Sequence, residues 1–167
     1  GFVAGNAKRG ASADGGDAGK SSSGYFCGER GGEAIADILC GLVNPSGRLT
    51  ETFPYSLSDI PAVQSYRNGN VTLYSEGLNV GYRYFDTFQI PVRYPFGYGL
   101  SYSLFKYENI SLALEENALC ISYWIHNVSD VGGKEVSQVY VRPIAAKVYR
   151  PNKELKGWSK DFIASGK

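Results

Sequence analysis

The sequence predicts an α+β chain that joins part of an α/β sandwich to part of an antiparallel β-sandwich. Apolar residues between 34 and 42 recur at helical spacing, whereas those between 105 and 163 alternate with polar residues. Between these regions, residues 74–107 set aromatic side chains among glycines and a proline, which is typical of a chain that crosses tightly from one packed layer to another. We therefore expect two incomplete modules and a connecting segment.

The composition divides the chain into four segments. Residues 1–24 are dominated by Gly, Ala and Ser and show no periodicity, so they cannot bury enough apolar area to offset the entropy of ordering. The expected segments are a disordered stretch over 1–24, the end of an α/β module over 25–54, an interdomain linker over 55–103 and a truncated β-sandwich over 104–167.

The first regular element is expected to be an amphipathic helix that begins near Gly31. Its apolar positions fall three or four residues apart, at Ala34, Ile35, Ile38, Leu39 and Leu42. Gly41 is placed to end the helix in a left-handed cap, and Asn44-Pro45-Ser46-Gly47 predicts a turn with proline at its second position. Residues 48–53 follow as a short extended segment. A helix, a turn and a strand make half of an α/β unit, so the module is incomplete.

The second half of the chain is expected to consist of strands. Residues 55–80 are polar and rich in turn formers, with Asn68-Gly69-Asn70 as the clearest bend, and no helix is expected there. The predicted strands are 105–114 with a bulge between Tyr107 and Ile110, 119–125, 135–142 and 154–163, and residues 115–118 form a hairpin turn. Because roughly seven strands are usual in a sandwich, this module also looks cut short.

The charge balance argues against several classes of partner. With 17 basic and 16 acidic residues, the net charge of +1 gives no electrostatic footprint for nucleic acid or anionic lipid. No apolar run reaches the roughly 20 residues of a spanning helix, and no secretion signal opens the sequence, so we expect a soluble chain without a membrane partner. The sequence also indicates no cofactor and no metal.

The cysteines and the possible glycosylation sites point to different compartments. Cys27, Cys40 and Cys120 are odd in number and lack C-x-x-C spacing, so we expect free, mostly buried thiols and favour the cytoplasm slightly over secretion. Three Asn-x-Ser/Thr patterns, which begin at Asn70, Asn109 and Asn127, argue weakly the other way.

Five sequence blocks occur in an order that is characteristic of one enzyme family. They are GEAIADILCG at 32–41; NPSGRL at 44–49 followed by TFP at 52–54; YSEGLNVGYRY at 74–84; PFGYGLSY at 95–102; and EV at 135–136 through YV at 140–141 with ELKGW at 154–158. Together they resemble the C-terminal part of glycoside hydrolase family 3, which includes many β-glucosidases and β-xylosidases. The resemblance covers about residues 25–167.

The resemblance carries expectations about fold and activity. It implies that residues 25–54 end the family's α/β-sandwich domain and that residues 104–167 begin its fibronectin type III-like domain. It implies a parent enzyme that hydrolyses β-linked glucosides or related oligosaccharides with retention, through a covalent glycosyl-enzyme. The family's nucleophile is an aspartate in an N-terminal barrel, and its acid/base carboxylate usually lies upstream of the helix near Gly31. The resemblance therefore places no catalytic residue in this chain, and the missing barrel would be its partner.

The acidic side chains are the candidates for any remaining chemistry. Retaining hydrolysis needs two carboxyl groups about 5 to 5.5 Å apart. The candidates are Glu29, Glu33, Asp37, Glu51, Glu76 and Asp86. Glu33 and Asp37 are four residues apart on the predicted helix, a spacing that is typical of a solvated face. Glu76 is expected to pin the linker through backbone hydrogen bonds or an ion pair, for example with Arg83, and a contact to sugar is the alternative.

Other candidates have a structural and a functional interpretation. His126, the only histidine, ends a predicted strand and is expected at the surface or in a turn. Tyr94, Phe96, Tyr98 and Tyr102 could stack on sugar rings, but their alternation with Gly and Pro favours an interdomain core. Trp158 is expected to anchor the sandwich to its neighbour, with a binding surface as the alternative.

The sequence leaves three functional hypotheses. The first is a C-terminal part of a family 3 glycosidase, inactive as an isolated chain because both expected carboxylates lie elsewhere. The second is a non-catalytic carbohydrate-binding or accessory β-sandwich, which would need an exposed aromatic platform. The third is a truncated gene product of marginal stability, whose half-modules expose surfaces meant for absent partners.

Overall fold

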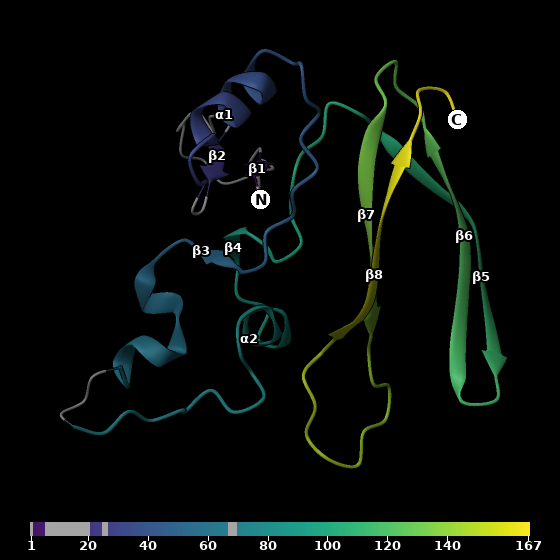
Figure 1. The fold of residues 1–167 in the computed structure, drawn as a ribbon. Helices are drawn as coiled ribbons and strands as arrows, with labels where there is room; N and C mark the ends of the chain where they lie inside the picture. The colour runs from purple at the N-terminus through teal and green to yellow at the C-terminus, as the bar shows by residue number, and fades with distance from the viewer. Residues whose placement is uncertain (1, 6–20, 25–26, 67–69) are drawn as a thin grey trace, which may run out of the picture.

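The computed structural model describes residues 2–5, 21–24, 27–66 and 70–167 (Figure 1). Along the chain the elements are β1 (Phe2–Gly5), β2 (Ser21–Gly24), α1 (Gly31–Leu39), β3 (Phe53–Pro54), the 3₁₀ helices η1 (Leu57–Asp59) and η2 (Pro61–Gln64), α2 (Tyr82–Thr87), β4 (Val92–Tyr94), β5 (Phe105–Glu115), β6 (Ala118–Asn127), β7 (Gly133–Val141) and β8 (Glu154–Ile163). The strands form four antiparallel pairs, β1–β2, β3–β4, β5–β6 and β7–β8. This is the predicted α+β class.

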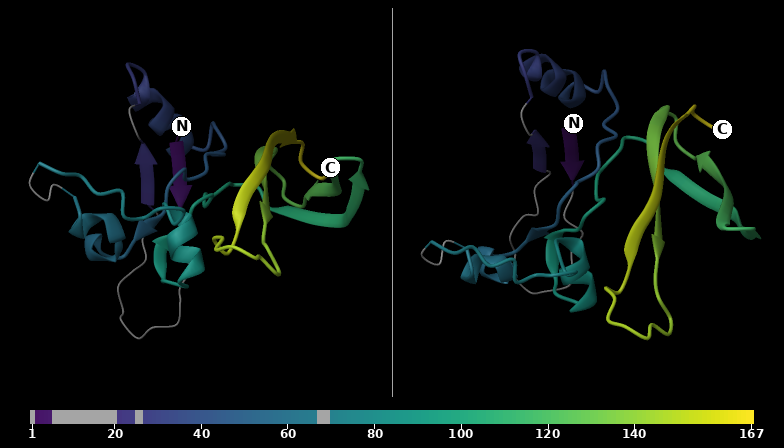
Figure 2. Two further views of the ribbon diagram at one scale, coloured as in Figure 1. Left: turned by 90° about the horizontal axis from the view of Figure 1, so that it is seen from below. Right: turned by 60° about the horizontal axis from the view of Figure 1, so that its bottom comes forward.

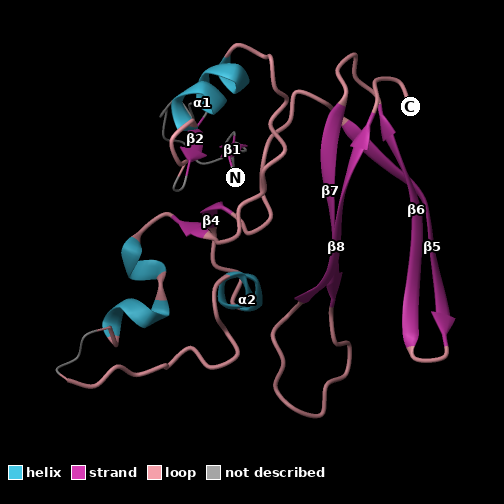
Figure 3. Cartoon of the chain, viewed as in Figure 1, coloured by secondary structure: helices cyan, strands magenta, loops and turns pink. Residues whose placement is uncertain are grey.

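Helices and long strands occupy different sides of the molecule. Figure 3 shows the helices in the first half of the chain and the long hairpins β5–β6 and β7–β8 in the second half. The two views in Figure 2 show the same separation, with the connecting chain running from the α2 side to the hairpins. The described part of the chain therefore has two bodies, one that contains the helices and one that contains the long hairpins.

The N-terminal segment differs in part from its prediction. We expected disorder over 1–24, but residues 2–5 and 21–24 pair as β1 and β2, with Phe2 opposite Gly24. An antiparallel pair joins main-chain groups and needs no apolar periodicity, so composition did not reveal it. Residue 1 and residues 6–20 lie outside the described residues, as do residues 67–69, which contain part of the predicted bend at Asn68-Gly69-Asn70.

Helix α1 ends as its sequence predicts. Gly41 has φ +76°, its amide donates to the Ile38 carbonyl, and the Leu42 amide donates to the Asp37 carbonyl. These two bonds form a Schellman cap, in which glycine supplies the left-handed residue. Of the predicted apolar face, Ile38 is buried, whereas Leu39 and Leu42 are 71% and 77% exposed. The helix therefore covers little of its apolar surface within the described residues.

The chain after α1 corrects one prediction. Asn44-Pro45-Ser46-Gly47 forms neither a turn nor a regular element. The reason is tertiary: the Asn44 side chain bonds to residues 57 to 88 positions further along the chain, which fixes the segment against them. Local turn propensity gives way to these bonds. The extended segment that was predicted over 48–53 leads into β3, which pairs with β4.

The linker contains more helix than the sequence suggested. Two 3₁₀ helices lie between residues 57 and 64, where no helix was expected, and α2 follows in the aromatic segment. Ser56 caps η1 through a reciprocal box with Asp59. Gly81, with φ +58°, turns the chain into α2. Helices this short leave too few periodic positions to be read from the sequence.

The hairpins confirm the predicted strands. β8 has the predicted bounds, and β5 and β6 meet at a turn whose Glu116 has φ +35°. The register of the β5–β6 pairing shifts between Glu108 and Ser111. Asn109 and Ile110 therefore both lie opposite Tyr123, in the expected bulge. Residues 143–153 form the predicted loop. Period-two alternation was sufficient to locate these elements.

The β-hairpins leave their apolar face largely uncovered. Ile110 and Leu112 are each 66% exposed and Leu114 is 82% exposed. An open groove of about 490 Å³ lies between the hairpins, lined by Tyr107, Ile110, Leu112, Ile121, Tyr123, Ser137, Gln138, Val139 and Tyr140. Figure 1 shows the hairpins converging toward the C-terminus and separating at their other ends. Asn127 joins the converging ends, because its side chain donates to the carbonyls of Val131 and Ile163.

Candidate functional site at the seam between linker and hairpins

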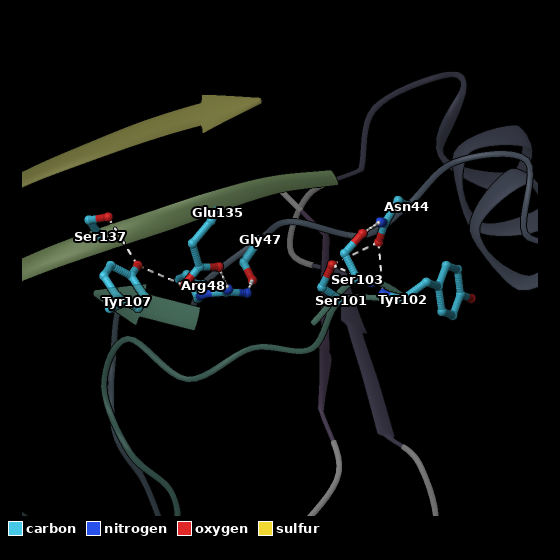
Figure 4. A network of polar contacts seen from close by, with 9 residues as sticks. All are labelled: Asn44, Gly47, Arg48, Ser101, Tyr102, Ser103, Tyr107, Glu135 and Ser137. Carbon is cyan, nitrogen blue, oxygen red and sulfur yellow. Dashed lines mark hydrogen bonds and ion pairs between the residues drawn. The ribbon is translucent and has the colours of Figure 1, made fainter. Parts of the chain in front are cut away.

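The candidate site is the place where the segment after α1, the aromatic linker and the hairpins meet. Two main-chain hydrogen bonds join the first two of these. The Leu49 amide donates to the Tyr98 carbonyl over 2.8 Å, and the Gly97 amide donates to the Leu49 carbonyl over 2.7 Å. They hold the segment after α1 against the PFGYGLSY block. We call the nine residues drawn in Figure 4 the seam: Asn44, Gly47, Arg48, Ser101, Tyr102, Ser103, Tyr107, Glu135 and Ser137.

Two glycines allow these segments to approach closely. A Cβ on Gly99 would collide with the Gly47 carbonyl oxygen, which belongs to the main chain and cannot rotate away. Gly97 has φ +78°, and a Cβ there would collide with the Gln138 side chain of β7. A side chain at position 99 would force the linker away from the Gly47 main chain, whereas at position 97 the Gln138 side chain could move and the cost would be the strained left-handed backbone. The glycines of the block are therefore required for close packing.

An ion pair joins the two bodies. Arg48 Nη2 lies 2.5 Å from Glu135 Oε2 of β7, and their side chains are only 15% and 13% exposed. Tyr107 on β5 donates its hydroxyl to Glu135 Oε1 over 3.0 Å and shares a second hydrogen bond with Ser137. Burial chiefly raises the pKa of Tyr107 to about 12, and the Glu135 charge acts in the same direction. The phenol therefore stays protonated and remains a donor near neutral pH.

Asn44 is the hub of the second half of the seam. Its Nδ2 donates to Ser103 Oγ over 2.7 Å and to the Gly132 carbonyl over 3.0 Å. Its Oδ1 accepts from Ser101 Oγ and from the Tyr102 amide. Figure 4 shows the bonds of Asn44 with Ser101, Tyr102 and Ser103 beside the Arg48–Glu135 pair. Both ends of the Asn44 amide are thus occupied by groups from the linker and from the turn before β7.

Aromatic rings extend the contact toward β7 and β8. The ring centroids of Phe96 and Tyr82 are 4.6 Å apart. The Tyr82 ring packs edge-on against that of Tyr140 on β7, with their centroids 5.9 Å apart. The Tyr82 hydroxyl also accepts from the Leu155 amide of β8. Elsewhere in the linker, Tyr94 stacks on Tyr98, with ring centroids 5.7 Å apart. Of the four aromatic residues of the block, Phe96 reaches β7 through Tyr82, whereas Tyr94 and Tyr98 pack on each other and Tyr102 is 49% exposed, so the interdomain interpretation holds only in part.

A charged cluster lies beside α2. Glu154 at the start of β8 is 3.5 Å from Arg83 and 3.1 Å from Lys156. The hydrogen bond from Lys156 is the main cause that lowers the pKa of Glu154, and nearby cations add to it. This corrects the suggested Glu76–Arg83 pair, because the ion pair of Arg83 is with Glu154. The two residues are distant in sequence, so no local pattern indicated their contact.

The six candidate carboxylates are dispersed. Glu33 pairs with Arg30 on the exposed side of α1, and Glu29 and Glu51 are exposed. Asp86 pairs with Lys153 over 3.1 Å and is the only acid lining a cavity of about 50 Å³ beside Tyr82 and Tyr140. Asp37 and Glu76 are partly exposed, and neither lines that cavity. Within the described ranges no group of His, Cys, Asp and Glu could hold a metal ion.

Several other candidates take definite positions. His126 lies at the end of β6, stacked on Trp124 and 3.6 Å from Glu108, as a surface histidine. Trp158 is 70% exposed within this chain, and its role as an anchor of the sandwich to a neighbouring domain stays a prediction. Cys40 and Cys120 are free thiols, but all three cysteines are exposed, and the expectation of mostly buried thiols is wrong. Among the described helices none has the length and apolar character to cross a bilayer.

Comparisons with known proteins place this arrangement in a class. The model of the glycosyl hydrolase family 3 C-terminal domain matches residues 23–102. Thermostable beta-glucosidase B of Acetivibrio thermocellus is 44% identical over 147 residues, which cover 85% of this chain and 20% of that protein. Exo-alpha-(1->6)-L-arabinopyranosidase of Bifidobacterium longum is 41% identical over 145 residues, covering 85% of this chain and 19% of that protein.

Solved structures give the same result. The GH3 beta-glucosidase of Bifidobacterium adolescentis superposes with a TM-score of 0.83 at 40% identity, over 89% of this chain and 22% of that one. Beta-glucosidase 3B of Thermotoga neapolitana, solved with glucose, gives a TM-score of 0.79 at 39% identity, over 83% of this chain and 20% of that one. The chain belongs to glycoside hydrolase family 3 and corresponds to a C-terminal part of its members. It spans about a fifth of the length of these relatives.

The buried ion pair should dominate the stability of the seam. Replacing Arg48 by methionine keeps its apolar stem but leaves Glu135 buried without its partner, so we expect a loss of about 3 kcal/mol in the free energy of unfolding. The matched control is Arg30→Met, which removes an exposed pair and should cost less than about 1 kcal/mol. Urea unfolding followed by fluorescence measures both values, and equal losses in the two variants would contradict the account.

Tyr107 should make stability fall in alkali. The unfolded phenol ionises near its ordinary pKa of 10.0, whereas the folded one holds its proton to about 12. Between these values the folded state binds more protons, so the free energy of unfolding should decrease as pH rises from 10.0 to about 12 and level off above. Tyr107→Phe should weaken this decrease in unfolding titrations, whereas Tyr55→Phe, at a 70% exposed position, should not. An unchanged slope in Tyr107→Phe would rule out this role.

Proposed function

We propose that this chain is the C-terminal scaffold of an enzyme that hydrolyses β-glucosides or related oligosaccharides with retention, through a covalent glycosyl-enzyme. The superposition on a GH3 beta-glucosidase at a TM-score of 0.83, over 89% of the chain, carries the proposal. The contribution of these residues is the seam, which fixes the linker against the hairpins. The remaining domains, including a barrel with the nucleophilic aspartate, are the partner that this scaffold serves.

The proposed domain division is the one that the family resemblance implies. Residues 25–54 would end the α/β-sandwich domain, residues 55–103 would link the domains, and residues 104–167 would form part of a fibronectin type III-like domain. Two antiparallel hairpins with an apolar groove between them support the last assignment. The family match begins at residue 23, which sets most of the first 24 residues apart.

The chemistry would take place outside these residues. Glu33 and Asp86 are engaged by Arg30 and Lys153, and Asp86 faces its cavity without a second acid. Retaining hydrolysis needs one carboxylate to attack the sugar and another to protonate the leaving group. Because the described residues place no two such groups around one cavity, we expect that the isolated chain neither forms nor resolves a glycosyl-enzyme. We therefore assign no catalytic residue to it.

The choice of sugar would also be made elsewhere. The names of two relatives, a beta-glucosidase and an arabinopyranosidase, give them different sugars, yet this chain is 44% and 41% identical to them. A scaffold that holds domains in place can be shared by enzymes with different pockets. The seam is therefore a structural element of the proposed enzyme and not part of its specificity pocket.

The purified 167-residue chain should not release nitrophenol from aryl β-glucosides. The physical reason is the dispersal of its carboxylates, and the assay compares the chain with a tag-only control at equal concentration. Turnover above that control would refute the assignment. If turnover appeared, Asp86→Asn would be the first variant to test, because Asp86 is the candidate acid that faces a cavity.

An alternative function has one specific observation in its favour. Trp158 on β8 and Trp124 on β6 are 70% and 64% exposed, and exposed aromatic faces can stack on sugar rings. A non-catalytic carbohydrate-binding module would use such a platform.

Titration of the chain with cello-oligosaccharides, followed by tryptophan fluorescence and calorimetry, separates the two functions. The scaffold function predicts no saturable binding. Binding that is lost in Trp158→Ala but kept in Tyr98→Ala, whose ring is stacked on Tyr94, would establish the alternative.

A further inference from the structure

The three Asn-x-Ser/Thr patterns occupy structurally different places. Asn127 is 1% exposed, and its amide nitrogen donates to the Val131 and Ile163 carbonyls. Its Oδ1 accepts from the amide and the hydroxyl of Ser129, the third residue of the same pattern. A glycan on this nitrogen would replace one of its two hydrogens, so it would break at least one of the donated bonds, and the sugar would have to fit at a side chain that is buried. The folded chain therefore has no room for sugar at Asn127.

Asn109 has the opposite surroundings. Asn109 lies in the bulge of β5, has φ +53° and is exposed to solvent. No hydrogen bond or ion pair joins its side chain to any described residue. Asparagine is one of the few residues that tolerate the left-handed conformation, so the bulge explains the residue type but not the Ser two positions later. Ser111 is also exposed and lies opposite Ser122, where no contact requires a hydroxyl.

We propose that Asn109 is an N-glycan acceptor of the folded chain and that Asn127 is not. In this reaction the Asn109 amide nitrogen displaces a lipid-linked diphosphate from the anomeric carbon of an oligosaccharide. The new bond is the N-glycosidic one, the bond that breaks joins the anomeric carbon to the diphosphate oxygen, and the lipid-linked diphosphate leaves with the electron pair while the proton of the amide passes to it or to water. The donor is the lipid-linked oligosaccharide of a secretory compartment, so the proposal goes beyond hydrolytic function and does not depend on it.

The test is to direct the chain through the secretory pathway of yeast and map its glycans. A Thr72→Ala background removes the pattern at Asn70, so that any remaining glycan lies at Asn109 or Asn127. Enzymatic release of the glycan converts its asparagine to aspartate, and peptide mass spectrometry locates the change. We expect Asn109 to be occupied and Asn127 to be unmodified in the secreted chain, or in the protease-resistant fraction if the chain is retained.

Three further variants separate glycan acceptance from folding. Ser111→Ala keeps Asn109 and its bulge but should lose the glycan, whereas Ser111→Thr should keep it. Asn109→Gly preserves the positive φ and should also lose the glycan. An unmodified Asn109 in the Thr72→Ala chain, or a glycan on Asn127 of the folded chain, would overturn the proposal.

Discussion

The ion pair between Arg48 and Glu135 is the contact on which the rest of the structure depends. Its partners lie 87 residues apart and belong to the two bodies of the molecule. Ile38, Leu49 and Phe85 are the buried hydrophobic side chains in the described ranges, so apolar burial alone holds these bodies weakly. Because both side chains of the pair are largely shielded from water, either one alone would be costly to bury. Separating the two bodies therefore breaks an ion pair whose geometry is specific.

The other seam contacts share this directional character. Asn44 fixes the linker through both ends of its amide, and Gly99 allows the main chain to approach the Gly47 carbonyl. Hydrogen bonds weaken steeply when their geometry changes, whereas apolar contacts tolerate sliding. A seam built in this way sets the orientation of the hairpins as well as their distance. For the scaffold function that we propose, orientation is the property that matters.

The sequence predicted the elements that depend on local periodicity. Alternating apolar residues located β5, β6 and β8, and Gly41 marked the end of α1. It did not predict contacts that depend on distant partners. The turn expected at Asn44-Pro45-Ser46-Gly47 is absent because Asn44 bonds across the seam, and Arg83 meets Glu154 instead of Glu76. Helix α2 is too short to show a periodic pattern. The seam could have been suspected only from Gly97 and Gly99, whose spacing among aromatic residues indicated a tight crossing.

Amide hydrogen exchange of Leu49 and Gly97 tests the account most directly. Their amides form the two main-chain bonds that hold the linker segments together. If the seam joins the two bodies into one cooperative unit, the Leu49 and Gly97 amides should have the same free energy of opening as the central amides of β7. Arg48→Met should then lower the free energies of opening of all these amides by the same amount. Exchange of the Leu49 and Gly97 amides at the rate of an unstructured peptide, while β7 stays protected, would contradict the central claim.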